Sequence, residues 1–369
     1  MATRKGASLA SADRTARPRL LLVSMYPLDE GLWGPTVRIT NLRRELGERV
    51  DLDVVSGYRG TRRGALARYA FSGRLRGLDG IYVESSTFLP SESDIAFLGL
   101  ARALGIPVLT YIRDAYQLFP DLYPATTLRR RAGTLAFRPA IWALTKASSR
   151  LAYPSRGLAR AVSGTDIDAV ILPPGSPSPA LVERNPDARR LLYVGNGRDA
   201  VQGAPLLLAA VQLARDRGAS VDLTVVSRPG EAPPPPYPSW LRVMAAEGDE
   251  ITALLSDVIA TVIPRPRTAY NDLALPVKLF DYLAFGRPLL VTECTEQAAI
   301  VSAHDAGVVV GDGVTELAEG VMRIAASEPA QIDWWAGNAT RAALENGWGR
   351  RSDAILEALD IHPSAEPTA

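Results

Sequence analysis

The sequence predicts an α/β protein with two domains, each built on a mostly parallel sheet. Length is the first indication, because 369 residues suggest two domains at roughly 150 residues each. The second is the regular alternation of short apolar runs with amphipathic segments, which is typical of parallel strands joined by helices. The third is a turn-rich segment at 173–187, after which the same alternation starts again.

The first half contains short, continuous apolar runs of the kind that form strands buried on both faces of a sheet. They predict strands at 18–24, 50–56, 80–85, 107–114, 149–155 and 169–174. Helices are expected between them, one opening at Pro35, one ending near Gly105 and a long one over about 132–150.

The second half repeats this pattern. Strands are expected at 189–195, 221–227, 256–264, 287–293 and 306–311. Pro205 marks the start of one helix and Pro276 the start of another, since proline suits a first helical position. The last periodic segment, 339–359, predicts one final helix.

Composition excludes several classes of protein. A net charge of +1 argues against nucleic-acid binding, and one cysteine, Cys294, leaves no internal disulfide or multi-cysteine metal site. Residues 1–17 hold no apolar run, so they predict a disordered tail rather than a secretory signal. The sequence contains no run of about 18 apolar residues, so no membrane span is expected. We therefore expect a cytoplasmic protein.

A ligand is expected in the crevice between the two sheets, at the carboxyl ends of the strands. Lys278 is notable there, because the chain has three lysines against 38 arginines. It falls in the first turn of the expected helix, where the helix dipole favours an anion. A bound phosphate would satisfy both the lysine and the free N–H groups of that turn. A surface ion pair between Lys278 and Asp281 explains the pattern equally well.

The loop GNGRDAVQG at 195–203 follows the first strand of the second half. Gly195 and Gly197 allow close approach to a phosphate, and Arg198 would be its cation. The spacing G-x-G-x-x-A also permits a dinucleotide site, in which Arg228 would bind a ribose 2′-phosphate. Pro205 places the helix start late for that motif. A glycine-rich turn with an exposed arginine is the plain alternative.

Two further segments of the first half follow strands. GLWGPTVR at 31–38 contains Gly31 and Gly34, which permit close backbone approach, and Arg38 on the helix that follows. YIRDAYQLFPD at 111–121 places Arg113 and Asp114 at a strand end, where Asp114 is the best-placed carboxylate for acid–base work. For the segment 31–38, the alternative is a turn with a solvated Arg38. For 111–121, it is a structural ion pair between Arg113 and Asp114.

Two basic stretches lie in the same half. Residues 60–77 carry five arginines, residues 128–142 carry four, and neither contains an acid. Either could rest on anionic lipid, and a solvated basic face is the commoner outcome.

Several motifs together resemble retaining nucleotide-sugar glycosyltransferases of the GT-B fold, in the broad family-four group. The strongest is LPVKLFDYLAFGRP, which looks like the family block P-x-K-[LF]-[FL]-E-Y-[LM]-A-x-G-[KR]-P. GLWGPTVR resembles the acceptor-side loop, and YIRDAYQLFPD the R-D-L-W-P-E segment. ILPPG resembles the end of the first domain, and NGWGRRSDAIL the helix that crosses back to it.

The resemblance implies two Rossmann-like domains facing a cleft and transfer of a sugar from a nucleoside diphosphate sugar to an acceptor hydroxyl, with retention and no obligatory metal or other cofactor. Lys278 would neutralise the leaving diphosphate and Asp281 would bind the ribose. Arg113 and Asp114 would face the sugar or the acceptor, which could be lipid-linked or a polysaccharide in a bacterial glycan, glycolipid or natural-product pathway. The protein would then work in the cytoplasm, possibly at the inner face of the membrane.

The chain departs from the family pattern at three positions. The first acid of the E-x7-E motif falls on Leu273, the lysine of the donor loop on Gln202, and the histidine before the aspartate on Arg113. These departures leave open a catalytically inactive scaffold of the same fold.

The expected division of the chain follows from these motifs. After a tail at residues 1–17, we expect an acceptor-side domain at 18–178 and a nucleotide-sugar domain at 179–337. A crossover helix at 338–360 and a tail at 361–369 would follow.

Overall fold

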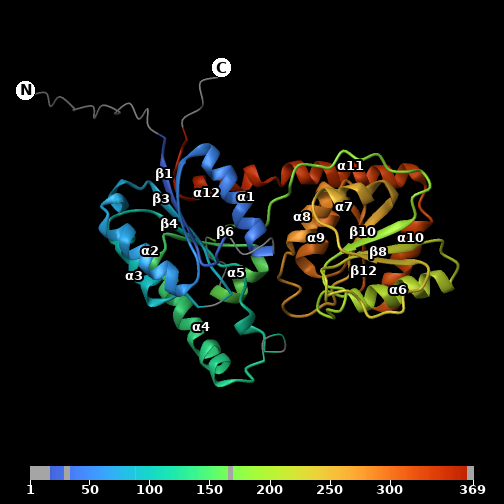
Figure 1. The fold of residues 1–369 in the computed structure, drawn as a ribbon, viewed down its shortest axis with the longest axis horizontal. Coiled ribbons are helices and arrows are strands. Elements are labelled where there is room, and N and C mark those ends of the chain that lie inside the picture. Colours follow the sequence, from blue (N-terminus) through green and yellow to red (C-terminus); the bar gives the residue numbers. More distant parts are fainter. Residues whose placement is uncertain are drawn as a thin grey trace, which may run out of the picture.

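The computed structural model describes residues 17–28, 34–87, 89–120, 122, 124–164 and 169–363. It shows two α/β halves side by side along the long axis of the molecule (Figure 1). The predicted N-terminal tail lies outside the described residues apart from Arg17, and the C-terminal tail is described as far as Pro363. The predicted fold class is confirmed, because each half contains a six-stranded parallel sheet.

The first sheet has the strand order β2-β1-β3-β4-β5-β6. Its strands are β1 (Arg19–Ser24), β2 (Asp51–Ser56), β3 (Gly80–Glu84), β4 (Val108–Tyr111), β5 (Arg150–Tyr153) and β6 (Val170–Ile171). The helical segments of this half are α1 (Gly34–Arg49), α2 (Arg59–Phe71), η1 (Arg74–Gly77), α3 (Glu92–Ala103), η2 (Tyr116–Leu118), α4 (Leu128–Ala147) and α5 (Arg156–Ser163).

The second sheet has the order β12-β11-β10-β7-β8-β9. Its strands are β7 (Arg190–Val194), β8 (Asp222–Val226), β9 (Leu241–Met244), β10 (Val258–Ile263), β11 (Leu289–Thr292) and β12 (Gly307–Val310). The helical segments that follow in this half are α6 (Ala204–Asp216), α7 (Asp249–Leu254), η3 (Leu255–Asp257), α8 (Val277–Ala284), α9 (Thr295–Ala303), α10 (Val314–Ala325) and α11 (Pro329–Glu345).

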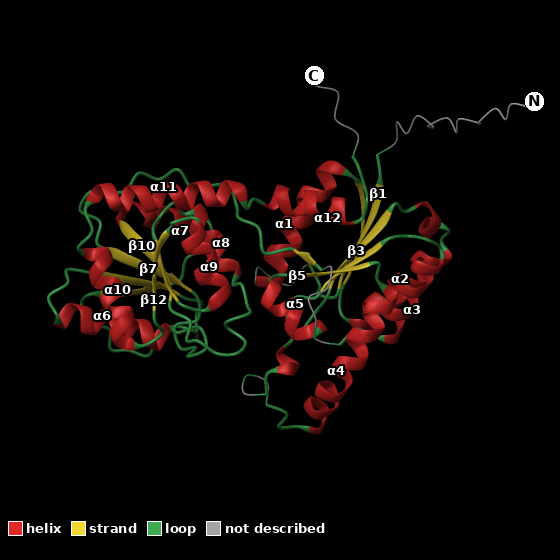
Figure 2. Cartoon of the chain, turned by 180° about the vertical axis from the view of Figure 1, so that it is seen from behind, coloured by secondary structure: helices red, strands yellow, loops and turns green. Residues whose placement is uncertain are grey.

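Burial on both faces explains why the strands are continuous apolar runs. In β1, Leu20 and Leu22 belong to one buried cluster, while Leu21 and Val23 belong to the cluster on the opposite face. Helices flank both sheets (Figure 2), so side chains pointing either way leave water. Each half therefore has its own core.

One strand was not predicted. β9 follows a proline-rich loop and pairs in parallel with β8, with Leu223 opposite Leu241. It is a short edge strand with partly exposed side chains, so its sequence lacks the apolar run that marks the others.

The prediction of one final helix over 339–359 is wrong. α11 ends at Glu345, and a separate helix, α12 (Trp348–Ala358), begins after an extended Gly347. α11 belongs to the second half, where its alanines pack in one buried cluster with α8. α12 lies in the first half, where Trp348 and Ile355 join the core beneath β1. The expected crossing back to the first half is therefore confirmed, but it is made by α12.

The two segments that connect the halves run beside each other. The amide of Ser176 donates to the carbonyl of Asn346 at 2.8 Å, and Ser176 forms a parallel bridge with Gly347. Gly175 lies against the indole of Trp348, where an added Cβ would come within 2.4 Å of the ring. Close contact at this glycine thus fixes where the chain passes from one half to the other.

We expect Gly175→Ala to destabilise the protein by about 1–3 kcal/mol, because the added methyl must displace the buried indole or the connecting backbone. The midpoint of urea unfolding, followed by circular dichroism, measures this change. Gly99→Ala is the matched control, since its Cβ would enter open space in α3. Helix propensity predicts a gain of up to about 1 kcal/mol there. Equal midpoints for the two variants would contradict the role of Gly175.

Candidate active site

A cavity of about 820 Å³ lies between the two halves. The last residues of three strands line it: Tyr111 of β4, Val194 of β7 and Val226 of β8. The carboxyl ends of both sheets therefore open into one space, which is where open parallel sheets bind their ligands.

Lys278 lies in the first turn of α8, as predicted, and lines this cavity. Its ammonium donates to Gln202 Oε1 at 3.1 Å and lies 4.7 Å from the centre of the Tyr193 ring. Gly195 passes close beneath it with a φ of 152°, and a Cβ added there would clash with Nζ at 2.6 Å. Burial, followed by the charge of Arg265, lowers the pKa of Lys278 to about 7.

Asp281 lies one turn further along α8 and also lines the cavity. Burial raises the pKa of its carboxyl to about 7, and Lys278 opposes that rise. Among the described residues, no ion pair joins Lys278 to Asp281 within 4.0 Å, so the surface-pair interpretation is wrong. Tyr282, the next residue of α8, is buried, and its hydroxyl accepts from the amide of Val194 at 2.7 Å.

The loop 195–203 contributes less than expected. Gly197 is packed against Pro233, and a Cβ there would lie 2.5 Å from the proline ring. Arg198 is exposed, and its Nε donates to the carbonyl of Ala232 at 2.6 Å. Arg198 does not line the cavity between the halves, whereas Gln202 does. The plain alternative, a glycine-rich turn with an exposed arginine, describes this loop.

Arg265, which the sequence analysis missed, supplies a second cation beside Lys278. It follows β10 and lines the cavity, where burial lowers the pKa of its guanidinium. Nη1 donates to the carbonyl of Ala274 at 3.2 Å, and Nη2 bonds to the side chain of Asn271. Its position two residues past a strand end was the available signal, the same signal that singled out Arg113.

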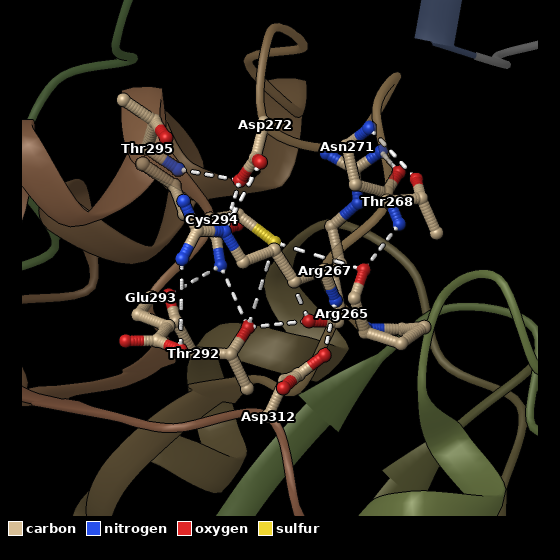
Figure 3. Close-up of polar contacts among 12 residues, drawn as sticks. Arg265, Arg267, Thr268, Asn271, Asp272, Thr292, Glu293, Cys294, Thr295 and Asp312 are labelled. Carbon is tan, nitrogen blue, oxygen red and sulfur yellow. Dashed lines mark hydrogen bonds and ion pairs between the residues drawn. The ribbon is translucent and has the colours of Figure 1, made fainter. Parts of the chain in front are cut away.

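A polar cluster holds the backbone of Arg265 in place (Figure 3). The hydroxyl of Thr292 donates to the Arg265 carbonyl at 2.5 Å, and the thiol of Cys294 donates to it at 3.4 Å. Cys294 is fully buried, and burial raises the pKa of its thiol. Asp272 ties the neighbouring Arg267 to this cluster through an ion pair of 3.0 Å.

Arg113 and Asp114 line the cavity from the first half. Nε of Arg113 lies 3.8 Å from Asp114 Oδ2, which also accepts from the hydroxyl of Thr87 at 3.1 Å. Burial raises the pKa of the Asp114 carboxyl. Among the described residues, its buried Oδ1 has no hydrogen-bond partner. That oxygen is available to a ligand.

Arg38 is buried, so the solvated-arginine interpretation is wrong. Its Nε donates to Glu84 Oε1 at 2.9 Å, and its guanidinium lies 3.9 Å from the centre of the Tyr111 ring in the cavity wall. Gly34 is the first residue of α1, and Gly31 lies outside the described residues.

The two halves also touch at the rim of the cavity. Tyr270 of the second half packs against Tyr116 and Phe119 of the first, with ring centres 4.5 and 5.3 Å apart. The hydroxyl of Ser155 donates to the carbonyl of Leu273 at 2.5 Å, and the Leu273 side chain packs against the core of the first half. Leu273 therefore contributes to contact between the halves.

Comparison with known proteins agrees with this geometry. Residues 188–327 match the family model described as Glycosyl transferases group 1. No curated protein matches the chain by sequence.

Solved structures match nearly the whole chain. Sucrose-phosphate synthase from Thermosynechococcus elongatus is 13% identical, with a TM-score of 0.64, covering 92% of this chain and 98% of that one. HepE from Anabaena, in complex with UDP and glucose, is 13% identical, with a TM-score of 0.61 and coverage of 92% and 99%. A UDP-forming α,α-trehalose-phosphate synthase from Burkholderia xenovorans is 12% identical, with a TM-score of 0.60 and coverage of 93% and 100%.

The chain thus has the GT-B fold, and residues 188–327 of its second half are similar to the group 1 glycosyl transferases. This similarity agrees with the predicted class of enzyme, a glycosyltransferase. Within the described ranges, no three His, Cys, Asp or Glu side chains come together as metal ligands, and no helix has the length and hydropathy to cross a bilayer.

We expect Lys278→Met to stabilise the free protein at about pH 6 by about 1–2 kcal/mol and to have a smaller effect near pH 9.5. The folded-state pKa of Lys278, about 7, lies below its ordinary value of 10.5. Below pH 7 the protein therefore carries the full cost of a buried ammonium, and this cost falls as the pH rises towards 10.5. Thermal unfolding at both pH values measures the difference.

Arg198→Met is the control for this experiment. It also removes a cation from the second half, but at an exposed position, so its effect should not change with pH. A Lys278→Met variant less stable than wild type at about pH 6 would show that the ammonium is not desolvated.

Proposed function

We propose that the chain transfers a sugar from a nucleoside diphosphate sugar to an acceptor hydroxyl, with retention of anomeric configuration. The observation that carries this proposal is the convergence of Lys278 and Arg265 on one cavity at the first turn of α8. Two half-buried cations that face the same space repel each other unless an anion lies between them. A diphosphate supplies that anion and also accepts hydrogen bonds from the free N–H groups of α8.

The same cations would assist the reaction. When the bond from the sugar to the diphosphate breaks, negative charge grows on the leaving oxygen. Lys278 and Arg265, already desolvated and held in place, would stabilise that charge without reorganising. This chemistry needs no additional cofactor, and independence from metal stays part of the proposal.

One carboxylate on each side of the cleft would orient a substrate. Asp281, on the cavity side of α8, would accept hydrogen bonds from the ribose hydroxyls, while Gly195 leaves space beside Lys278. On the opposite wall, Asp114 Oδ1 would accept the proton of the acceptor hydroxyl or of a sugar hydroxyl. Arg113 would hold that carboxylate, and Arg38 would support the wall through Glu84.

The printed names of the structural neighbours support the nature of the donor. One is UDP-forming and another binds UDP and glucose. By analogy we propose a nucleoside diphosphate donor here, and an acceptor from a bacterial glycan, glycolipid or natural-product pathway in the cytoplasm or at the inner face of the membrane. The dinucleotide site considered for the 195–203 loop loses support, since α6 begins at Ala204, too late for that motif.

A catalytically inactive scaffold is the second candidate. The observation in its favour is Leu273, which contacts the first half where the resemblance expects an acid facing the sugar. Such a protein could bind nucleotide without transferring sugar.

We expect isothermal titration with UDP and GDP to show that at least one of them binds. Arg265→Ala and Lys278→Ala should each weaken this binding about 10- to 100-fold, because each removes a charged contact to phosphate. Arg198→Ala is the matched control and should bind as wild type does, since its side chain is outside the cavity. An equal loss of nucleotide affinity in Arg198→Ala and Arg265→Ala would indicate that the phosphate binds at the 195–203 loop. No binding of either nucleotide would contradict the proposal.

Binding should also weaken as the pH rises above about 7, by up to tenfold per unit. The Lys278 amine of the free protein is neutral there, so the diphosphate can bind its ammonium form only with uptake of a proton. Titration in buffers of different ionisation enthalpy measures that uptake. Lys278→Met should bind without proton uptake. A wild-type affinity that does not change with pH would show that Lys278 does not bind the phosphate.

Activity distinguishes the enzyme from the scaffold. With the donor found by binding, proton NMR of the first-formed product should show the anomeric configuration of the donor. Asp114→Asn should lower kcat by at least about tenfold while leaving nucleotide affinity intact, because the carboxylate faces the acceptor side. An inverted product would contradict retention. Nucleotide binding without any transfer would favour the scaffold.

A further inference from the structure

Helix α4 exposes an apolar stripe on its outer face. Leu128, Leu135 and Trp142 have side chains that are 84%, 80% and 65% exposed. They lie seven residues apart, which is nearly two helical turns, so they form one line along the helix. Phe137 and Leu144, on the opposite face, are buried in the core of the first half.

This stripe is unusual for a helix in water. The buried face of α4 already satisfies the need of an amphipathic helix to cover one apolar side. A second apolar line on the outer face gains nothing from folding, and aligned exposed apolar residues mark interaction sites. In Figures 1 and 2, α4 projects from the first half, away from the second half.

The charges on α4 are all positive. The helix carries Arg129, Arg130, Arg131, Arg138 and Lys146, all exposed, and its sequence contains no acid. Arg131 and Arg138 fall three residues after Leu128 and Leu135, so they flank the apolar stripe on one side. An apolar line beside basic groups is the pattern of a helix that lies in a lipid interface.

The whole first half shares this charge. Residues 18–178 carry 21 Lys and Arg against 14 Asp and Glu, whereas residues 179–360 carry 16 against 24. The net charge of +1 conceals a positive half joined to a negative one. Such an asymmetry would orient the molecule at an anionic surface with the first half towards it.

The other basic stretch, 60–77, is not equivalent. Arg62 is buried and paired with Asp94 at 2.6 Å, and Arg74 pairs with Asp53 at 2.6 Å. Arg63, Arg68 and Arg76 of this stretch are exposed, but Phe71 is its one exposed large apolar residue, so it has no apolar line beside its charges. Of the two stretches expected to contact lipid, α4 therefore has the better pattern.

We propose that α4 docks the first half on an anionic lipid bilayer. Leu128, Leu135 and Trp142 enter the boundary between headgroups and acyl chains, where tryptophan is favoured. The flanking arginines bind lipid phosphates. A second copy of the chain is a poorer occupant, since a symmetric contact through α4 would bring two sets of arginines together. The inference stands independently of the proposed sugar transfer.

Co-sedimentation with vesicles tests this proposal on the full chain. We expect binding to phosphatidylcholine vesicles that contain phosphatidylglycerol, weaker binding at high salt, and little binding to phosphatidylcholine alone. Leu135→Ser with Trp142→Ser should abolish binding. Arg131→Gln and Arg138→Gln should each weaken it about fivefold. Tryptophan emission should shift to the blue on binding, and Trp142→Phe should remove that shift.

Phe71→Ser is the matched control, because Phe71 is a 91%-exposed apolar residue on α2, outside the stripe. It should bind vesicles as wild type does, and all variants should unfold at the wild-type temperature, since the changed residues are exposed. Vesicle binding that Leu135→Ser with Trp142→Ser leaves intact would overturn the proposal. So would no wild-type binding, or a dimer in size-exclusion chromatography that this double variant dissociates.

Discussion

The position of the cleft depends on the contact between Trp348 and Gly175. The chain passes between the halves twice, and at this point the two passages lie side by side, joined through Ser176 and Asn346. Because Trp348 is buried in the core of the first half, the end of the second half cannot move without moving that side chain. The hydroxyl of Ser176 also donates to the carbonyl of Phe280 at 2.6 Å, which connects this junction to α8. One close-packed glycine thus links the relative position of the sheets to the helix that carries Lys278.

The cavity that results contains charges that are poorly matched in the free protein. Lys278 has Gln202 rather than an acid as its hydrogen-bond acceptor, and burial moves the pKa values of both Lys278 and Asp281 to about 7. Such an arrangement costs stability, and sites that bind charged ligands commonly carry this cost. A diphosphate would supply the missing negative charge. The same argument separates Lys278 and Arg265 from Arg62, whose partner Asp94 is built into the first half.

The first half combines two features that face different partners. Its cavity wall carries Asp114 and Arg38, and η2, which holds Tyr116 of the same wall, contacts α4. Under the proposed docking of α4, an acceptor held on a membrane would lie close to this half. The second half carries Lys278, Asp281 and Arg265, together with most of the negative charge. This division gives each half one substrate in the proposed reaction.

The sequence by itself determined the two sheets and the place of Lys278. Strands such as β1 are short apolar runs because both faces are buried, and Lys278 was found because a proline and a helix start are local signals. Tertiary structure decided the rest. The burial of Arg38 depends on Glu84, 46 residues away, and the second cation of the cavity is Arg265 rather than Arg198 because the 195–203 loop turns Arg198 towards Ala232. The break between α11 and α12 depends on a core in the other half that receives Trp348. Each of these outcomes rests on a partner distant in the chain, which local periodicity does not encode.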